Sequence, residues 1–158
     1  MNAVDFLKSQ HREVEELFTR IEKTRGKSGV GRDRRELVNE LSQKLMAHTK
    51  IEEMILYPEG KSVDEDLTLE AYEEHECVKS VIKKLARTRA SDETFMAKVT
   101  VLKELVEHHV EEEEKEYFPK LKTELGEERL EQLGEDLETA FEKLSSRKSP
   151  KLTLMKAS

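Results

Sequence analysis

The residues with the clearest chemical potential in this sequence belong to a short pattern that occurs twice. The pattern HxxxEExxx[YF]P runs from His48 to Pro58 and again from His109 to Pro119. Residues four apart on an α-helix lie on one face, one turn apart, so the histidine and the first glutamate of each copy form a two-point ligand set. This spacing indicates a metal site. We also expect the proline that ends each copy to end its helix.

A single histidine precedes each copy of the pattern at a similar distance, His11 before His48 and His75 before His109. This repetition predicts a duplicated helical hairpin. In an antiparallel bundle, early residues of the first and third helices lie at the same end as late residues of the second and fourth. Six side chains are therefore expected to meet in one layer: His11, His48, Glu52, His75, His109 and Glu113.

The composition favours a small helical protein. The chain has 158 residues, which suits one domain with a single core. Charged residues make up 40% of the chain and aromatic residues 5%, and there is no tryptophan. This balance is typical of long helices rather than of sheets, so we predict an all-α fold.

The charge and the distribution of apolar residues argue against two classes of partner. The formal net charge is −7, and no basic patch is present of the kind that nucleic-acid phosphates require. No segment approaches the roughly 20 apolar residues that cross a bilayer, and the N-terminus does not resemble a signal peptide. The single cysteine, Cys77, fits a reducing compartment. We therefore expect a cytoplasmic monomer or homodimer without nucleic-acid or membrane partners.

The spacing of apolar residues predicts four long helices, at about 3–24, 33–57 and 64–87, with the fourth ending near Pro119. They form an antiparallel up-down-up-down four-helix bundle over about 3–122, with a short fifth helix at about 127–145. We expect one domain over 1–145 and a flexible tail at 146–158. In each of the four main helices, a histidine falls within the apolar stripe where a bundle core would take leucine.

Polar ligand groups at core positions call for a cation, since burying an ionised carboxylate without a partner costs several kcal/mol. Four imidazoles and two carboxylates are too many for one tetrahedral zinc ion, and the mixed nitrogen and oxygen set suits iron or manganese. Because a carboxylate has two oxygens, Glu52 and Glu113 could each bridge two irons. His11 and His48 would then hold one iron, and His75 and His109 would hold the other.

Two other helical metal sites are excluded by the sequence. Ferritin-like di-metal bundles use Glu-x-x-His, and no histidine here has a glutamate three residues before it. The His-Glu-x-x-His motif of zinc proteases is also absent.

Several neighbouring residues are assigned simpler roles. Tyr57 and Phe118 are expected to close the end of the bundle, and His108, about 100° around the helix from His109, is expected at the surface. Glu53, Glu112 and Glu114 lie in acidic runs that are typical of solvated faces, although an acidic rim could assist metal capture.

At these residues the chain resembles the hemerythrin-like, or HHE cation-binding, domain family, over about residues 2–121. Gln10-His11, the two HxxxEExxx[YF]P patterns and Glu74-His75 occur in the order of that family. The resemblance implies a non-haem di-iron centre, bridged by an oxo or hydroxo group and by two carboxylates, with the six side chains above as ligands. The N-terminal sequence and the fifth helix also resemble mycobacterial hemerythrin-like proteins, a group associated with peroxide decomposition.

The sequence departs from oxygen-carrying hemerythrins, which have a His-x-x-x-His pair on the third helix. Here the positions one turn from His75 are Ala71 and Lys79, and Glu113 replaces the aspartate bridge. The iron at His75 and His109 therefore has one nitrogen ligand fewer and more open positions. Tyr72, three residues before His75, could bind this iron, donate a hydrogen bond near it or simply pack.

The expected function is reaction with peroxide, nitric oxide or oxygen, which could include catalase- or peroxidase-like turnover in stress defence. The alternative is an oxygen- or iron-binding sensor or storage module without turnover.

Overall fold

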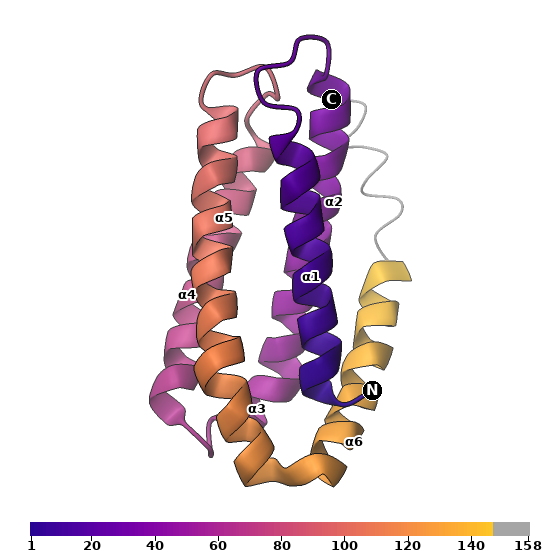
Figure 1. Cartoon of the computed structure of the whole chain (residues 1–158), viewed down its shortest axis with the longest axis vertical. Helices are drawn as coiled ribbons and strands as arrows, with labels where there is room; N and C mark the ends of the chain where they lie inside the picture. The colour runs from indigo at the N-terminus through magenta and orange to yellow at the C-terminus, as the bar shows by residue number, and fades with distance from the viewer. Residues whose placement is uncertain (147–158) are drawn as a thin grey trace.

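The computed structural model describes residues 1–146, and within that range the chain is helical and has no strand. The helices are α1 (Ala3–Glu22), α2 (Gly31–Ile51), α3 (Tyr57–Gly60), α4 (Glu65–Ala86), α5 (Phe95–Glu112) and α6 (Phe118–Ser146). Two π-helical segments, η1 (Glu52–Leu56) and η2 (Glu113–Tyr117), join α2 to α3 and α5 to α6. Helices α1, α2, α4 and α5 form the predicted antiparallel bundle (Figure 1). Apart from Ser146, the predicted tail lies outside the described residues.

Helix α1 begins where the sequence predicts. The side chain of Asn2 accepts a hydrogen bond of 2.9 Å from the backbone amide of Asp5, which satisfies one of the free donors of the first turn. The apolar stripe of the helix, which includes Leu7, Val14 and Phe18, is buried. Hydrophobic spacing and capping therefore both fix the orientation of the first helix.

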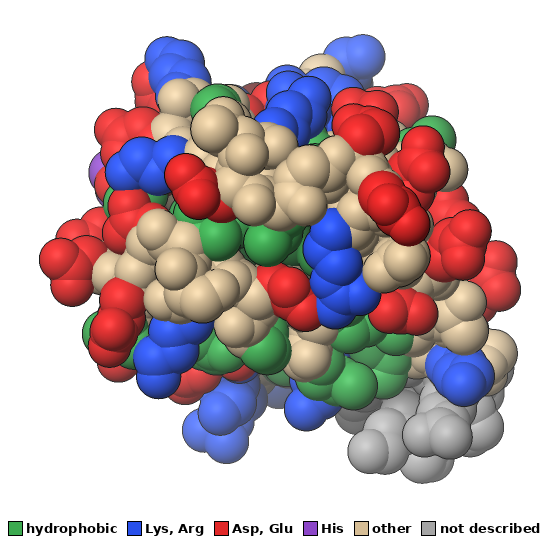
Figure 2. Space-filling view, turned by 90° about the horizontal axis from the view of Figure 1, so that it is seen from below, with side chains coloured by type: hydrophobic (Ala, Val, Ile, Leu, Met, Phe, Trp, Pro, Cys, Tyr) green, Lys and Arg blue, Asp and Glu red, His purple; other side chains and the backbone are tan. Residues whose placement is uncertain are grey.

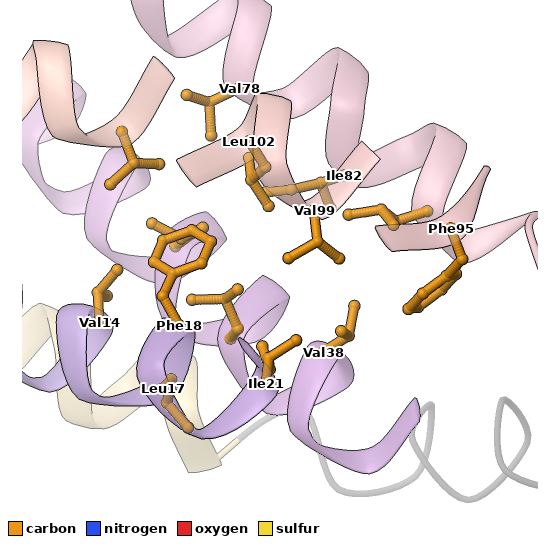
Figure 3. Packing of buried hydrophobic residues seen from close by; sticks show 14 residues of the cluster. Val14, Leu17, Phe18, Ile21, Val38, Val78, Ile82, Phe95, Val99 and Leu102 are labelled. Atoms are coloured by element: carbon orange, nitrogen blue, oxygen red, sulfur yellow. The ribbon is translucent and has the colours of Figure 1, made fainter. Parts of the chain in front are cut away.

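Buried apolar side chains form two clusters, one on each side of the histidines. The first lies toward the loops that join α1 to α2 and α4 to α5, and includes Phe18 and Phe95 (Figure 3). The second lies at the other end and combines the start of α1 with α3 and α6, through residues such as Leu7, Phe118 and Leu133. Along each long helix, the buried histidine lies between residues of these two clusters, so apolar packing encloses the histidine layer from both ends of the bundle.

The prediction that Pro58 and Pro119 end their helices is wrong. The helical path continues through both prolines, because each follows a π-helical segment. In η1 the amide of Tyr57 donates to the carbonyl of Glu52, five residues earlier, and η2 repeats this hydrogen bond. The wider turn relieves the clash that a proline ring makes with the preceding turn of a regular α-helix. Single π turns are frequent at functional sites.

The hydroxyl of Tyr72, on α4, donates a hydrogen bond to the backbone carbonyl of Glu53. This carbonyl lacks a donor within the helix because Pro58 has no amide hydrogen. In a five-residue hydrogen-bond register, the amide that Pro58 lacks would serve the carbonyl of Glu53. That carbonyl instead accepts a hydrogen bond of 3.3 Å from the hydroxyl of Tyr72. Tyr72 therefore joins η1 to the neighbouring helix.

Helix α6 has two limbs that meet at Gly126. The φ of 77° and ψ of 165° at this glycine lie outside the helical range, and a positive φ favours glycine. The second limb, residues 127–146, lies alongside α1 (Figure 1) and buries Leu130, Leu133 and Leu137. This limb is the predicted fifth helix.

Gly134 allows the second limb of α6 to approach the N-terminus closely. A Cβ atom at this position would lie 2.2 Å from the carbonyl oxygen of Met1 and 2.9 Å from the amide nitrogen of Ala3. We expect Gly134→Ala to lower the free energy of unfolding by about 1–3 kcal/mol, the usual cost of overpacking. Gly31→Ala is the control, because nothing lies within 4 Å of its Cβ. Equal urea-unfolding midpoints for the two variants would contradict the close contact.

Candidate metal centre

The six side chains predicted as ligands lie together in one buried layer. Their ligand atoms form two groups, each with all members within 4.8 Å of one another: His11, His48, Glu52 and Glu113, and then Glu52, His75 and His109. All six residues are buried, and Glu52 and His75 are completely so. The structure therefore brings the two hairpins together at one place, and Glu52 belongs to both groups.

Both glutamates lie between histidines of different hairpins. One carboxylate oxygen of Glu52 is 3.1 Å from Nε2 of His48, and the other is 3.1 Å from Nε2 of His75. Oε1 of Glu113 is 3.4 Å from Nε2 of His11 and 3.3 Å from Nε2 of His109. Each carboxylate is thus placed to serve ligand groups of both hairpins.

Three buried atoms of the layer have no hydrogen-bond partner in the described part of the chain: Nε2 of His11, Oε1 of Glu52 and Oε1 of Glu113. All three atoms face other ligand atoms of the layer. Native proteins pair nearly all of their buried polar atoms, so an unpaired set of this kind needs a reason. A bound cation provides one, because it accepts lone pairs from imidazole nitrogen and carboxylate oxygen together. The residues present therefore fit a metal ion.

The outer ring nitrogens of the four histidines are each held by an acceptor. Nδ1 of His48 lies 2.7 Å from the amide oxygen of Gln10. The other three face carboxylates, with Nδ1 of His11 2.8 Å from Glu114, Nδ1 of His75 3.0 Å from Glu53 and Nδ1 of His109 2.8 Å from Glu74. An acceptor at Nδ1 keeps the proton there and leaves the lone pair of Nε2 directed into the layer.

The expectation that Glu53 and Glu114 lie on purely solvated faces is therefore wrong. Each follows a layer glutamate by one residue and turns back toward a histidine on a neighbouring helix. A basic side chain balances each carboxylate on its outer side, Lys79 at 2.9 Å from Glu53 and Arg12 beside Glu114. Sequence spacing could not identify these pairs, because they join helices that are distant in the chain.

The charges in the layer shift its titrations strongly. Burial would raise the pKa of the Glu52 carboxyl, but the nearby imidazoles of His48 and His75 outweigh burial and hold that pKa well below its usual range. Burial would lower the pKa of His11, but the nearby carboxylates of Glu113 and Glu114 outweigh burial and raise the pKa to about 9. Without a cation, protons on the imidazoles therefore supply the positive charge that the carboxylates need.

Tyr57 also places its hydroxyl in the layer. The phenol oxygen lies 3.0 Å from Nε2 of His75, 3.3 Å from Nε2 of His109 and 3.2 Å from one oxygen of both Glu52 and Glu113. Its ring packs in the second apolar cluster and helps to close the end of the bundle, as expected, but its hydroxyl also contacts the proposed ligands. Burial, then the charges of the two carboxylates, raises the pKa of Tyr57 well above its usual range.

The π turn explains why sequence reasoning missed Tyr57. On a regular α-helix, Tyr57 would lie about 140° around the axis from Glu52 and would point away from the site. The five-residue hydrogen bond of η1 brings Tyr57 over Glu52 instead. The available signal was the aromatic residue directly before the proline in both copies of the pattern.

The chain that carries this layer matches the model of a known domain family. The model of the hemerythrin HHE cation-binding domain matches residues 2–121. The chain belongs to this family. The resemblance found in the sequence is therefore confirmed, and cation binding is the function that the family carries.

Two relatives extend the comparison of this HHE domain. A hemerythrin HHE cation-binding domain-containing protein from Mycobacterium kansasii has a similar structure, with a TM-score of 0.84, 27% sequence identity and coverage of 97% of this chain and 93% of that one. A protein named DNA nickase from Nostoc sp. is 28% identical over 148 residues. That match covers 93% of this chain but 41% of the relative, so the chain spans about two-fifths of the length of the Nostoc protein.

The two halves of this HHE domain differ at the aromatic residue before the proline. Phe118 stacks on His11 with ring centroids 5.9 Å apart and an interplanar angle of 7°. Its counterpart Tyr57 makes a tilted contact with His75, with centroids 5.2 Å apart. His11 and His75 therefore each contact the aromatic residue of the other hairpin, but only Tyr57, beside His75, carries a phenol oxygen.

A small cavity of about 20 Å³ lies against the layer on the side of the first apolar cluster. The four histidines of the HHE domain form one wall, and mainly valine and leucine side chains form the others. A cavity of this volume has room for about one water molecule or another molecule of similar size. Within residues 1–146, no helix combines the length and the apolar character that a membrane crossing needs.

Proposed function

We propose that the layer binds two iron ions and that the protein reacts with peroxide, nitric oxide or oxygen. The six proposed ligands are His11, His48, Glu52, His75, His109 and Glu113. The observation that carries the proposal is the position of Glu52, because its two oxygens each lie 3.1 Å from a histidine of a different hairpin. A carboxylate shared in this way suits a pair of ions, and the mixed nitrogen and oxygen donors suit iron.

An iron pair supplies the capacity to exchange two electrons with an oxidant or to bind a small gas molecule. The protein keeps the Nε2 lone pairs directed inward through the acceptors at Nδ1. It also excludes bulk water, because both apolar clusters close on the layer. Tyr57 places a phenol oxygen and its proton beside His75 and His109.

We propose Tyr57, rather than Tyr72, as the oxygen donor that replaces the missing imidazole on the His75 and His109 side. The contact between the Tyr57 hydroxyl and Nε2 of both histidines supports this assignment. Tyr72 directs its hydroxyl to the backbone of Glu53 and packs edge-on against the Tyr57 ring, with centroids 5.1 Å apart. The phenol oxygen of Tyr57 would then occupy the open position expected at the iron of His75 and His109.

The iron-loaded protein is expected to show a visible tyrosinate-to-iron absorption band that is lost in Tyr57→Phe. The variant should retain its iron, because the corresponding residue of the other half is already Phe118. Tyr72→Phe is the matched control and should keep the band. Loss of the band in Tyr72→Phe alone would assign the ligand to Tyr72, and absence of the band in the unaltered protein would contradict ligation by either tyrosine.

Two activities compete for this centre, redox turnover of peroxide and binding of oxygen or nitric oxide without turnover. The small cavity beside the histidines, with its apolar walls, could hold an uncharged gas molecule, and is the observation that keeps the second activity open. Iron content by elemental analysis, followed by addition of peroxide and measurement of evolved oxygen, separates the two. Sustained oxygen release supports turnover. An iron-loaded protein that releases none but binds nitric oxide is a sensor or storage module.

The name of the Nostoc relative does not lead us to propose a nucleic-acid substrate. The net charge is −7, and the end of the bundle seen in Figure 2 carries acidic and basic side chains interspersed, without a continuous basic surface on that face. Phosphate binding requires clustered positive charge. The absence of a nucleic-acid partner and the cytoplasmic location stay predictions.

A further inference from the structure

Three potential ligands outside the buried layer lie together on the outer face of α4 and α5. The ligand atoms of Glu74, His108 and Glu112 all lie within 4.8 Å of one another. Nε2 of His108 is 3.2 Å from one oxygen of Glu74 and 3.5 Å from one oxygen of Glu112. The His108 side chain is 66% exposed, as expected from the sequence, so an ion from solvent can reach it.

The charge around Glu74 is not balanced as it is around the equivalent carboxylates. Glu53 and Glu114 also hold Nδ1 of a layer histidine, and each has a lysine or arginine on its outer side. Among the described residues, the ion pairs of Glu74 and Glu112 are with histidines, and none is with lysine or arginine. The imidazole of His108 and the carboxylate of Glu112 lie where the basic side chain would be.

The first hairpin has no counterpart of this set of three groups. When the two hairpins are superposed by their patterns, Glu74 corresponds to Gln10, His108 to Ala47 and Glu112 to Ile51. None of these counterparts is charged, and Ile51 is fully buried in the cluster that contains α6 residues. The second hairpin therefore carries a ligand set where the first carries neutral residues.

The three groups border an open depression of about 630 Å³ on the surface. Glu70 and Glu73 also line it, so four carboxylates face the space in which His108 lies. One carboxylate, that of Glu74, joins this depression to the buried layer. Its Oε2 faces His108, while its Oε1 lies 2.8 Å from Nδ1 of His109.

We propose that Glu74, His108 and Glu112 form a surface site for a divalent transition-metal ion, and that iron enters the buried layer through it. One imidazole nitrogen and two carboxylate oxygens suit ferrous iron and similar ions. Three protein ligands leave the remaining positions to water, so the ion exchanges readily. Ion binding at the surface stands on its own residues, whereas the delivery of iron rests on the proposed function of the layer.

Titration of the iron-loaded protein with Co²⁺ tests the surface site. We expect the unaltered protein to bind one more Co²⁺ per chain than His108→Ala or Glu112→Gln. Glu104→Gln is the matched control, because it removes an exposed carboxylate one turn before His108 on α5. This variant should bind as many Co²⁺ ions as the unaltered protein. Equal Co²⁺ stoichiometry in all four proteins would overturn the site.

The rate of iron loading tests delivery. After addition of Fe²⁺ to metal-free protein, His108→Ala and Glu112→Gln are expected to load the buried layer several-fold more slowly than the unaltered protein and Glu104→Gln. All four proteins should reach the same iron content after desalting, which removes the readily exchanged surface ion. Equal rates would overturn delivery through this site. Failure of the proposed function is distinguishable, because the unaltered protein would then retain no iron after desalting.

Discussion

Glu52→Ala is expected to lose both irons rather than one. The two oxygens of Glu52 face His48 and His75, which belong to different hairpins, so removal of the carboxylate takes a ligand from both groups. It also leaves the buried imidazoles without the negative charge that balances bound cations. We expect the iron content measured after purification and desalting to fall from about two per chain to near zero. Glu113→Ala should behave in the same way, since Glu113 also lies between the hairpins.

Glu53, the residue after Glu52, provides the control for loss of iron. Glu53 holds Nδ1 of His75 from outside the layer, so Glu53→Gln should retain both irons and show an affinity about 10- to 100-fold lower. Circular dichroism of every variant checks that the bundle is folded. Glu52→Gln repeats the test without a cavity, because the side chain keeps its size. One retained iron in Glu52→Ala would mean that this carboxylate serves a single ion, and two would exclude it as a ligand.

The bundle could be predicted because the information that specifies it is local. The stripe of Leu7, His11, Val14 and Phe18 repeats every three or four residues, and Asn2 is a strong capping residue, so both α1 and its buried face follow from the sequence. The convergence of the ligands then follows from the antiparallel order of the helices. No detail of side-chain contact between helices was needed for either prediction.

The parts that were missed depend on contacts between helices or on unusual backbone geometry. A proline normally predicts a helix end, and the π turn that lets the chain pass through Pro58 has no simple sequence pattern. That turn also rotates Tyr57 into the layer. The pairs of Glu53 with His75 and of Glu114 with His11 join residues that are far apart in sequence, so helical spacing places these glutamates in an exposed run.

The pH dependence of stability is expected to differ between the metal-free and the metal-loaded protein. In the metal-free form, burial opposes the charge of His11, but the nearby carboxylates of Glu113 and Glu114 raise its pKa to about 9, from a usual value of 6.5. The pKa values of His75 and His109 are also raised, because their carboxylate partners outweigh burial. Protonated imidazoles therefore hold the metal-free layer together.

A raised pKa in the folded state gives stability that is complete below the unfolded pKa and is lost as pH rises through the folded pKa. The metal-free protein should therefore lose stability between pH 6.5 and about 9, by roughly 3 kcal/mol from His11 alone. The metal-loaded protein should gain stability as pH rises toward about 6.5 and then stay level, because a cation binds unprotonated imidazole. The stabilisation by metal is thus largest at alkaline pH.

Guanidinium unfolding of both forms between pH 5.5 and 9 measures this difference directly. Iron is kept in excess for the loaded form, so that dissociation does not limit its stability. In metal-free His11→Gln, the loss of stability above pH 6.5 should be smaller than in the unaltered protein, because the residue with the pKa of about 9 is gone. A metal-free protein with constant stability from pH 6.5 to 9 would mean that the buried imidazoles are neutral in the fold.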